Sequence, residues 1–564
     1  MSERSLPPVG THHDTGRHRA PSASSRLHVK LAAILASTGL VFAACGGDDD
    51  SATDEPEEVD ESGVSVTIDT PVDSTEVATG DSGPAEDTDP ADGDASGTLA
   101  EYEQQELSWG PCELLAGAEG DLPVEIDCAT ARVPIDYDDP TAGDTEIAML
   151  RIGSTGDAVG SMFLNPGGPG AAAQEFALER AAEFSPDVVA MYDLIGFDPR
   201  GIGASNPVDC LDTADLDDFL ATDTSPDDDA ETQQLADEIT ALGQGCAARS
   251  GDLASHMTTV ETARDLDILR AAVGDDVLNY VGESYGTYLG ATYAALFPDR
   301  VGRLVLDGAM SPDLSIDEIL LGQASGLERA LQAYIADCID AGDCPLGDDP
   351  DAATETVRTI TEAADAEPLP TQDPDRPLTQ SLAYYGIAQP MYVPDEWPVL
   401  TEALGAAVNG DGSGLLALSD LYTQRGPDGY TSSVQEAQKA VNCLDSQLRP
   451  NRPVDEQAFA DASTTWAPFL MGLNFCDGWP LTTTVESPDY TAPGAAPIVV
   501  VGTTRDPATP YEWAQALADQ LESGVLITRD GDGHTGYLVG NECVDAAVDA
   551  YLVDGDVPAD GTSC

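Results

Sequence analysis

The stretch VGESYGTYLG, residues 281–290, governs how the rest of the chain is interpreted. It places Ser284 between Gly282 and Gly286, after the apolar run VLNYV and before TYLGATYAALFP, whose apolar spacing suits a helix. A serine at a sharp strand-to-helix turn, with glycines on both sides because side chains would collide there, is typical of a nucleophile elbow. The flanking strand and helix signals make Ser284 the candidate nucleophile, whereas the pattern alone would recur by chance.

A serine nucleophile needs a general base, and only His256 and His534 lie beyond residue 44. Hydrolases with this elbow carry their catalytic residues in the order serine, acid, histidine, so His256 comes too early. We interpret it as a loop histidine before a helix. His534 follows the apolar run GVLITRD (524–530) and is the candidate base. The surrounding DGDGH does not complete the ligand pattern of a calcium loop, and we expect no metal.

The acid must orient the imidazole and stabilise its charged form. Asp506 follows the apolar run PIVVVG within GTTRDPATP and is the preferred candidate. Asp307, at the end of VGRLVLDG, is the rival because it also ends a predicted strand after the elbow.

Acyl transfer also needs amide donors aimed at the developing oxyanion. The segment LNPGGPG (164–170) follows a predicted strand, and its glycines let the backbone approach a substrate closely. The amides of Gly168 (Gly167 as the alternative) and Tyr285 are the candidate donors. A phosphate loop is excluded because no Gly-Lys-Ser/Thr follows.

Strand and helix signals alternate from about residue 100 onward. A helix is predicted over 258–274, with Thr258 and Glu261 as a capping box and Gly274 at its end. Apolar strands separated by helices predict an α/β fold with a mostly parallel sheet covered on both faces. The strand signals fall at 147–152, 161–165, 191–198, 277–283, 301–308, 497–502 and 524–530.

The strand signal stops between about 312 and 490, where the pattern is helical. A helical block between two late strands is expected to form a cap over the strand ends. The predicted organisation is therefore a hydrolase domain over 100–311, a helical cap over 312–490 and the rest of the hydrolase domain over 491–564.

The first 44 residues are predicted to be a secretory signal, because basic residues precede the short apolar stretch LAAILASTGLVFAAC. The junction at Cys45 resembles a bacterial lipobox, in which the cysteine is lipid-modified and becomes the N-terminus. Plain secretion with cleavage nearby is the alternative. Residues 45–99 are acidic and poor in apolar side chains, which predicts a disordered tether. The chain is thus expected to be exported and anchored to the outer face of the cell membrane.

The net charge and the cysteine content limit which binding partners and metal sites are expected. The formal net charge of −80 disfavours nucleic acid and anionic lipid surfaces. Apart from Cys45, ten cysteines remain in a chain expected to be exported, which predicts five disulfides, and we favour pairing of neighbours along the chain. A metal site is disfavoured because no CxxC pair occurs. The ten residues are Cys112, Cys128, Cys210, Cys246, Cys338, Cys344, Cys443, Cys476, Cys543 and Cys564.

With these motifs in order, the sequence from about residue 100 to the end resembles the tripeptidyl aminopeptidases of the α/β-hydrolase superfamily, which are serine exopeptidases related to prolyl aminopeptidases. The resemblance implies that Ser284, Asp506 and His534 are catalytic and that the cap limits entry to peptide ends. Asn165 stands where many relatives have histidine, a difference that is expected to leave the oxyanion hole intact and to change what supports it. The motifs that carry the resemblance are NPGGPG, FDPRGIGAS (197–205), GESYGTYLG, Trp-Pro at 397–398 and 479–480, GTTRDPATP and GHTGY.

The resemblance implies a peptidase that needs no cofactor and acts on peptides with a free N-terminus. An aminopeptidase must bind an ammonium group, usually with carboxylates, and the candidates are Glu283, Asp395, Glu396 and Asp445. In so acidic a chain, a solvated surface position is the favoured interpretation of each of them. A carboxylesterase using the same triad is the alternative function, and a non-catalytic binding protein is a third. The sequence does not indicate an oligomeric state.

Overall fold

The computed structural model describes residues 95–112, 114, 124–342, 344–474, 476 and 478–564. Over this part the chain forms a nine-stranded sheet in the order β1-β2-β4-β3-β5-β6-β9-β10-β11. Strand β2 is antiparallel to both of its neighbours, and every other pair in the sheet is parallel. The strands are β1 (Ile126–Pro134), β2 (Asp144–Ile152), β3 (Gly160–Asn165), β4 (Tyr192–Phe197), β5 (Leu278–Glu283), β6 (Val301–Asp307), β9 (Ile498–Arg505), β10 (Gly524–Asp532) and β11 (Thr562–Ser563).

This strand order, with helices on both faces, is the α/β-hydrolase fold that the sequence predicts. Seven of the nine strands coincide with the apolar runs. The sequence pattern missed β1, whose buried and exposed residues alternate, and β11, which is only two residues long. A half-exposed edge strand lacks the continuous apolar run that marks a central one.

Two apolar cores lie on opposite faces of the sheet because successive side chains of a strand point in opposite directions. Phe163, Tyr280 and Leu304 belong to one core, while Val281 and Val305 belong to the other. The covering helices are α3 (Ala173–Arg180), α4 (Pro186–Met191), α7 (Thr259–Val273), α8 (Tyr285–Leu296), α17 (Tyr511–Gln520) and α18 (Glu542–Asp554).

Helix α7 begins and ends where the sequence predicts. Thr258 accepts a hydrogen bond from the Glu261 amide, and the Glu261 side chain completes the capping box. Gly274 ends the helix in the left-handed conformation. These local signals fixed both ends of the helix because they satisfy backbone groups that the helix itself leaves unpaired.

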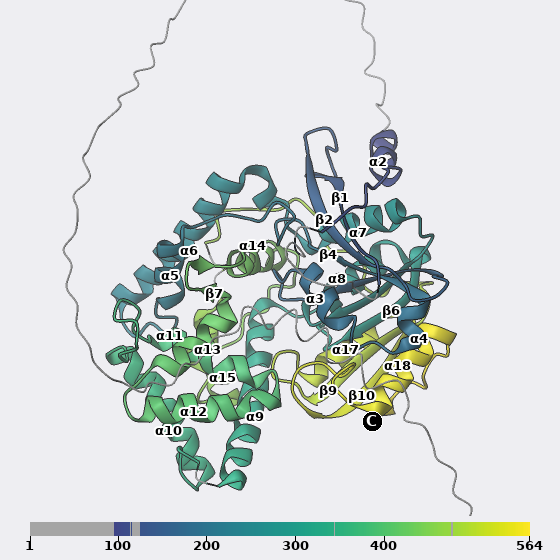
Figure 1. Ribbon diagram of the computed structural model, residues 1–564. Helices are drawn as coiled ribbons and strands as arrows, with labels where there is room; N and C mark the ends of the chain where they lie inside the picture. The colour runs from purple at the N-terminus through teal and green to yellow at the C-terminus, as the bar shows by residue number, and fades with distance from the viewer. Residues whose placement is uncertain (1–94, 113, 115–123, 343, 475, 477) are drawn as a thin grey trace, which may run out of the picture. The chain divides into compact units, whose positions relative to one another are not determined.

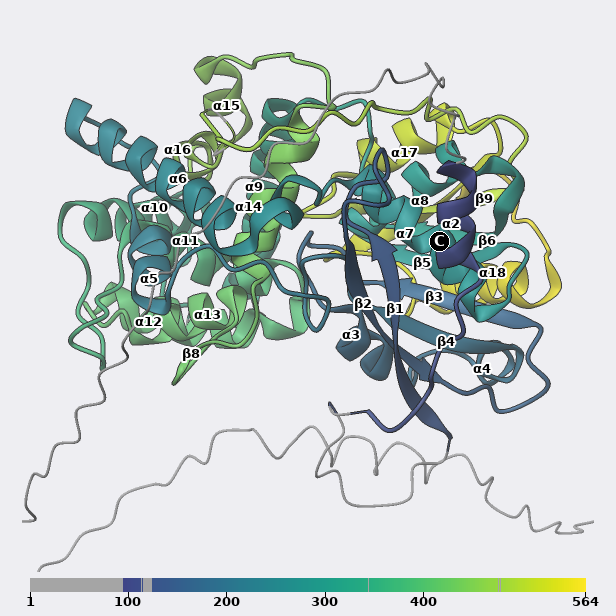
Figure 2. The ribbon, with the colours of Figure 1, turned by 90° about the horizontal axis from the view of Figure 1, so that it is seen from above.

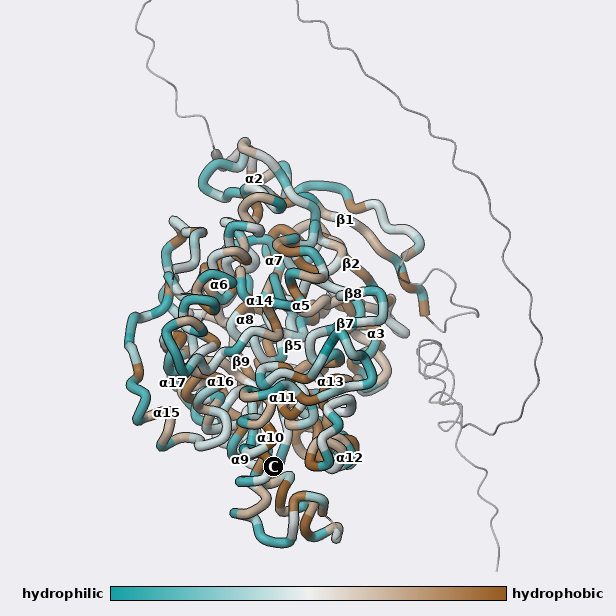
Figure 3. Tube along the Cα trace, turned by 90° about the vertical axis from the view of Figure 1, so that its left-hand side faces the viewer, coloured by the Kyte–Doolittle hydropathy of each residue, from teal (hydrophilic) through white to brown (hydrophobic). Residues whose placement is uncertain are grey.

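Between β6 and β9 the chain forms a set of helices and the small hairpin of β7 (Arg425–Gly426) and β8 (Gly429–Tyr430). Figures 1 and 2 show these helices grouped beside the sheet. Figure 3 shows both polar and apolar residues along them, as expected of helices with one buried face. They are α9 (Ile316–Ala341), α10 (Pro350–Ala366), α11 (Gln380–Ala388), α12 (Trp397–Val408), α13 (Ser413–Thr423), α14 (Val434–Ser446), α15 (Glu456–Ala462) and α16 (Ala467–Gly472).

Two helices from an earlier part of the chain pack against this group of helices. Helix α5 (Thr213–Ala221) packs against α11, and α6 (Asp229–Ser250) packs against α14. They lie between β4 and α7 in the chain, within the 100–311 segment that the sequence assigns to the hydrolase domain. The helical layer is therefore built from two segments of the chain.

The five disulfides among the described residues join neighbouring cysteines, as favoured from the sequence. The pairs are Cys112–Cys128, Cys210–Cys246, Cys338–Cys344, Cys443–Cys476 and Cys543–Cys564.

The predicted signal and Cys45 lie outside the described residues, as does the predicted tether up to residue 94. Helix α2 (Ala95–Glu103) crosses the expected end of the tether at residue 99. Within the described part of the chain, every helix is too short or too polar to span a bilayer.

Candidate active site

Ser284 occupies a strained turn between β5 and α8. Its φ of 56° and ψ of −124° lie outside the regions that non-glycine residues ordinarily adopt. The turn is too tight for side chains on either side. A Cβ at Gly282 would lie 2.5 Å from the Gly286 carbonyl oxygen, and one at Gly286 would lie 2.8 Å from the Asn165 carbonyl oxygen. The local geometry is therefore that of a nucleophile elbow.

His534 and Asp506 form a hydrogen-bonded pair in the loops after β10 and β9. His534 Nδ1 lies 2.9 Å from each carboxylate oxygen of Asp506. His534 Nε2 is buried and has no hydrogen-bond partner among the described residues. With Nδ1 engaged by a carboxylate, Nε2 is the nitrogen left to accept a proton.

The environment of His534 favours its protonated form. Burial opposes the positive charge, but the charge of Asp506 and its hydrogen bond to Nδ1 outweigh burial and raise the pKa of His534 above its ordinary 6.5. The buried carboxylates of Glu283 and Asp307 act in the same direction. An imidazolium formed during a reaction would therefore be stabilised.

Asp506 is held by its own loop. Its carboxylate accepts hydrogen bonds from the amides of Ala508 (2.9 Å), Thr509 (2.8 Å) and Thr535 (3.1 Å). The side chain is fully buried. These amides fix the carboxylate toward the imidazole, so Asp506 is positioned as the candidate acid.

Asp307, the rival acid, has a different position. Its carboxylate accepts hydrogen bonds from the amides of Gly536 (2.8 Å) and Tyr537 (2.8 Å), just beyond His534, and not from the imidazole. Its carbonyl oxygen accepts a hydrogen bond from the Ser284 amide at 2.8 Å. Asp307 thus connects the serine turn to the histidine loop. Burial, followed by the nearby Glu283, raises the pKa of Asp307 to about 7.

The segment before α3 lies against the serine turn. A Cβ on Gly167 would lie 2.8 Å from the Tyr285 amide nitrogen and 2.5 Å from the Glu283 carbonyl oxygen. The Gly167 amide already donates to Asn165 Oδ1 at 3.0 Å, whereas the Gly168 amide donates to no described residue. This favours Gly168 over Gly167 as the oxyanion donor, and the buried Asn165 supports the loop.

A cavity of about 160 Å³ opens onto Ser284. Gly168 and Thr509 line it from the hydrolase domain, and α9, α11, α14 and α16 supply most of the remaining described wall. A larger depression of about 1450 Å³ borders Pro166 and Ala171, but Ser284 is not among its lining residues. We therefore take the smaller cavity as the candidate active-site pocket.

The carboxylates predicted to bind a substrate ammonium do not line this cavity. Glu283 is buried and forms an ion pair with Arg180 at 2.9 Å. Asp445 is buried and accepts a hydrogen bond from the Thr259 amide at 2.9 Å, and burial raises its pKa to about 6. Asp395 is exposed and Glu396 is partly buried in a short turn before α12. None of the four belongs to the described wall of the cavity.

His256 lies before α7, as the sequence predicts. Its Nδ1 is 2.6 Å from a carboxylate oxygen of Glu261, which completes the capping box of α7. This partner gives His256 a structural role at the start of the helix.

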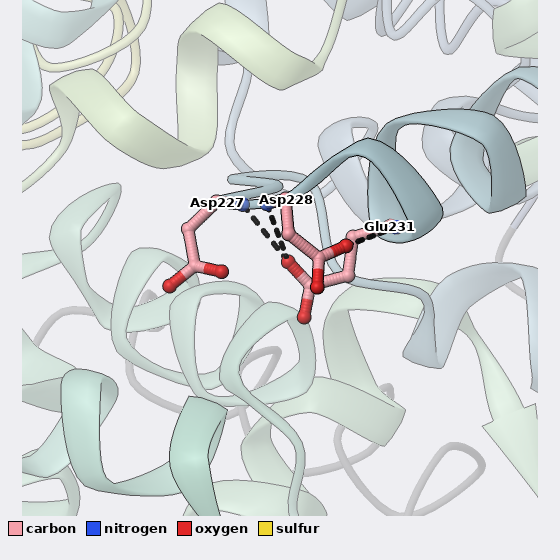
Figure 4. Close-up of side chains that lie close together, drawn as sticks. All are labelled: Asp227, Asp228 and Glu231. Carbon is pink, nitrogen blue, oxygen red and sulfur yellow. Dashed lines mark hydrogen bonds between the residues drawn. The ribbon is translucent and has the colours of Figure 1, made fainter.

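A cluster of carboxylates at the start of α6 contains Asp227, Asp228 and Glu231, whose oxygens lie within 4.8 Å of one another (Figure 4). Asp228 accepts hydrogen bonds from the amides of Ala230 and Glu231, and Glu231 accepts from the amides of Asp227 and Asp228. These hydrogen bonds cap the helix, which accounts for the cluster without a metal.

Sequence reasoning missed the contact between the helical layer and the histidine loop. The Tyr392 carbonyl accepts a hydrogen bond from the His534 amide at 2.9 Å, and the two rings meet edge-on with centroids 5.3 Å apart. It also missed Lys439, a buried residue of α14 that lines the cavity. Neither residue lies in a motif, so only the packing of the folded chain could reveal them.

The comparisons with known proteins agree with this fold. A family model described as "TAP-like protein" matches residues 460–564. Serine protease Hip1 of Mycobacterium tuberculosis is 37% identical over 479 residues, which cover 82% of this chain and 91% of that protein. Carboxylesterase B of the same organism is 36% identical over 492 residues, covering 84% and 93%. Tripeptidyl aminopeptidase of Streptomyces coelicolor is 33% identical over 480 residues, covering 81% and 86%.

Proposed function

Because the chain belongs to the TAP-like family of α/β-hydrolases, we propose that it is a serine exopeptidase that removes short peptides from a free N-terminus. The observation that carries the proposal is the hydrogen bond between His534 and the buried Asp506, in a loop that Asp307 connects to the strained Ser284 turn. The relatives named as a serine protease and a tripeptidyl aminopeptidase support a peptide substrate.

The mechanism follows from the roles of three side chains. His534 Nε2 takes the proton from Ser284 Oγ as the hydroxyl attacks the scissile carbonyl. Asp506 holds the imidazole through Nδ1 and stabilises its charged form. The amides of Gly168 and Tyr285 donate hydrogen bonds to the oxyanion of the tetrahedral intermediate. His534 then gives the proton to the departing amine, and water releases the acyl group by the same steps.

A carboxylesterase is the second candidate. One relative bears that name, and no described residue of the cavity wall supplies a carboxylate for a substrate ammonium. Ester and amide hydrolysis use the same triad, so the distinction depends on what the cavity binds.

The deciding experiment compares four reactions of the purified full-length protein. A fluorogenic tripeptide amide with a free N-terminus is tested beside its N-acetylated form and a simple ester, and the Ser284→Ala variant serves as the control. Cleavage of the free peptide alone, lost in the variant, supports the exopeptidase. Ester cleavage with both peptides intact supports the esterase. No cleavage of any substrate would favour a binding protein.

We also propose where the enzyme is located in the cell. A signal over residues 1–44 and lipidation of Cys45 would place the enzyme on the outer face of the membrane, with the acidic segment as a tether. Cys45→Ser should remove the lipid and release the protein from the membrane fraction. Membrane retention of this variant would contradict the lipid anchor.

A further inference from the structure

The cavity at Ser284 differs in character from the acidic surface of the chain. Its wall on one side is apolar, formed by Leu320 and Leu327 of α9 and by Phe469 and Leu473 at α16. A volume of about 160 Å³ is close to that of a dry protein cavity known to bind benzene, roughly 150 Å³. The cavity therefore matches one large apolar side chain in size.

Aromatic rings pack against one another along this wall. Tyr385 stacks on Tyr422 with ring centroids 5.2 Å apart and meets Phe469 edge-on at 5.3 Å. Tyr392 continues the row toward the edge of the His534 ring. A preformed aromatic surface binds an apolar group without ordering flexible side chains first, which favours affinity.

The position of the cavity identifies which substrate residue enters it. Ser284 and Gly168 both line the cavity, so the carbonyl attacked by Ser284 would lie at its mouth. The side chain nearest that carbonyl belongs to the residue that becomes esterified to Ser284. A charged side chain would lose its hydration against this apolar wall. Lys439 and Arg449 also line the cavity and would repel a basic side chain. Both already have partners in the protein, because Lys439 donates hydrogen bonds to Gln435 and Gln438, and Arg449 donates to the carbonyls of Pro312 and Leu314.

We propose that the cavity selects a large apolar side chain, such as leucine or phenylalanine, on the residue whose carbonyl is attacked by Ser284. This inference rests on the proposed exopeptidase function and specifies its substrate class. It makes the helical layer, and not the hydrolase domain, the main source of specificity at this residue.

The test is a panel of tripeptide amides Ala-Ala-X-aminomethylcoumarin with X as glycine, alanine, leucine, phenylalanine, aspartate or lysine. With the full-length protein, kcat/KM for leucine or phenylalanine should exceed that for alanine on the order of 10- to 100-fold, the range that apolar pockets achieve. A preference for glycine, alanine, aspartate or lysine would overturn the inference.

A matched pair of variants tests the cavity itself. Leu473→Trp places bulk in the cavity wall, whereas Leu421→Trp makes the same change at an exposed site on α13 outside the cavity. The first should lower the ratio of leucine to alanine cleavage at least tenfold, and the second should leave that ratio unchanged. An equal ratio in both variants would contradict the assigned cavity. If Leu473→Trp does not fold, the wild-type panel decides alone.

The two proposals fail in different ways. Cleavage of the panel with the wrong preference overturns the inference about the cavity and leaves the exopeptidase standing. Intact tripeptides together with ester hydrolysis that depends on Ser284 overturn the exopeptidase and remove the basis of the inference.

Discussion

Ser284 has a positive φ that an L-residue adopts at a cost of about 1–2 kcal/mol. The surrounding structure imposes this conformation through the Asp307 carbonyl, which accepts from the Ser284 amide, and through the two close-packed glycines. The turn places Ser284 between β5 and α8 and on the wall of the cavity. Stability is thus lost at the position where chemistry is proposed.

Replacing Ser284 by glycine should recover part of this energy. Glycine adopts positive φ without the Cβ clash, whereas alanine keeps it. We expect the free energy of unfolding of Ser284→Gly to exceed that of Ser284→Ala by about 1 kcal/mol, so that Ser284→Gly melts at a higher temperature. Both variants should be inactive. Thermal melts of the two proteins measure the difference. Equal melting temperatures would mean that the turn is not strained.

The Asp506–His534 pair predicts a defined pH dependence. The base must be neutral to act, so kcat/KM should fall as the pH drops through the pKa of His534, which Asp506 raises against the effect of burial. Asp506→Asn removes the carboxylate and leaves the burial, so the acid limb of the profile should move to lower pH. The rate should also fall roughly 10⁴-fold, as for other triads. If the acid limb of the profile does not move in this variant, a group other than His534 is responsible for it.

At the residue level, the sequence offers Ser284 and His534 as candidates because each follows a strand signal and histidine is scarce. It could not decide the acid by pattern alone, since Asp506 and Asp307 both end strands. Geometry separates them, because only Asp506 reaches the imidazole. The acids predicted for substrate binding were chosen without knowledge of packing. In the structure Glu283 is buried in an ion pair with Arg180, and Asp445 is buried and hydrogen-bonded to the Thr259 amide.

At the scale of elements, the loop between β3 and α3 depends on its glycines. Gly167→Ala would place a Cβ against the Tyr285 amide, the candidate oxyanion donor, so we expect a loss of kcat on the order of 10²-fold or more. Gly274→Ala is the matched control. Gly167 has φ of 94° and Gly274 has φ of 93°, but a Cβ at Gly274 meets nothing within 4 Å. An equal loss of activity in both variants would assign the effect to backbone strain.

The strands and helix α7 were predictable because apolar runs and caps are local signals. The membership of α5 and α6 in the helical layer was not, because it depends on contacts with α11 and α14, far along the chain. The bounds of the predicted cap, 312–490, therefore describe only the later of the two segments that build this layer.

At the scale of the whole molecule, the disulfides contribute unequally. Cys443–Cys476 closes a separation of 33 residues and both of its cysteines line the cavity, whereas Cys338–Cys344 closes only 6. The loop-entropy model gives roughly 3–4 kcal/mol for the longer loop and about 2 kcal/mol for the shorter. Replacing each pair by alanine should therefore cost more stability for Cys443–Cys476, measured by urea unfolding, and should lower activity only there. The reverse order would contradict the model.

The formal net charge of −80 predicts a response to salt. Like charges repel more strongly in the compact state, and salt screens this repulsion over about 10 Å at 0.1 M and about 3 Å at 1 M. We expect the melting temperature to rise with sodium chloride over this range. Sucrose at matched osmolality serves as the control, and an equal rise in sucrose would mean that the effect is not electrostatic.

The adjacency of β6 and β9 in the sheet has a consequence for how such enzymes diversify. The chain leaves the sheet at Asp307, the last residue of β6, and returns at Ile498, the first residue of the neighbouring parallel strand β9, so the inserted segment crosses from the carboxyl end of one strand to the amino end of the next. Because β6 and β9 pair directly, the segment between them can grow, shrink or be exchanged without changing the register of the sheet. A transplanted insertion would need to retain the carbonyl that Tyr392 offers to the His534 amide. New specificities could then be acquired by grafting, with the catalytic framework inherited unchanged.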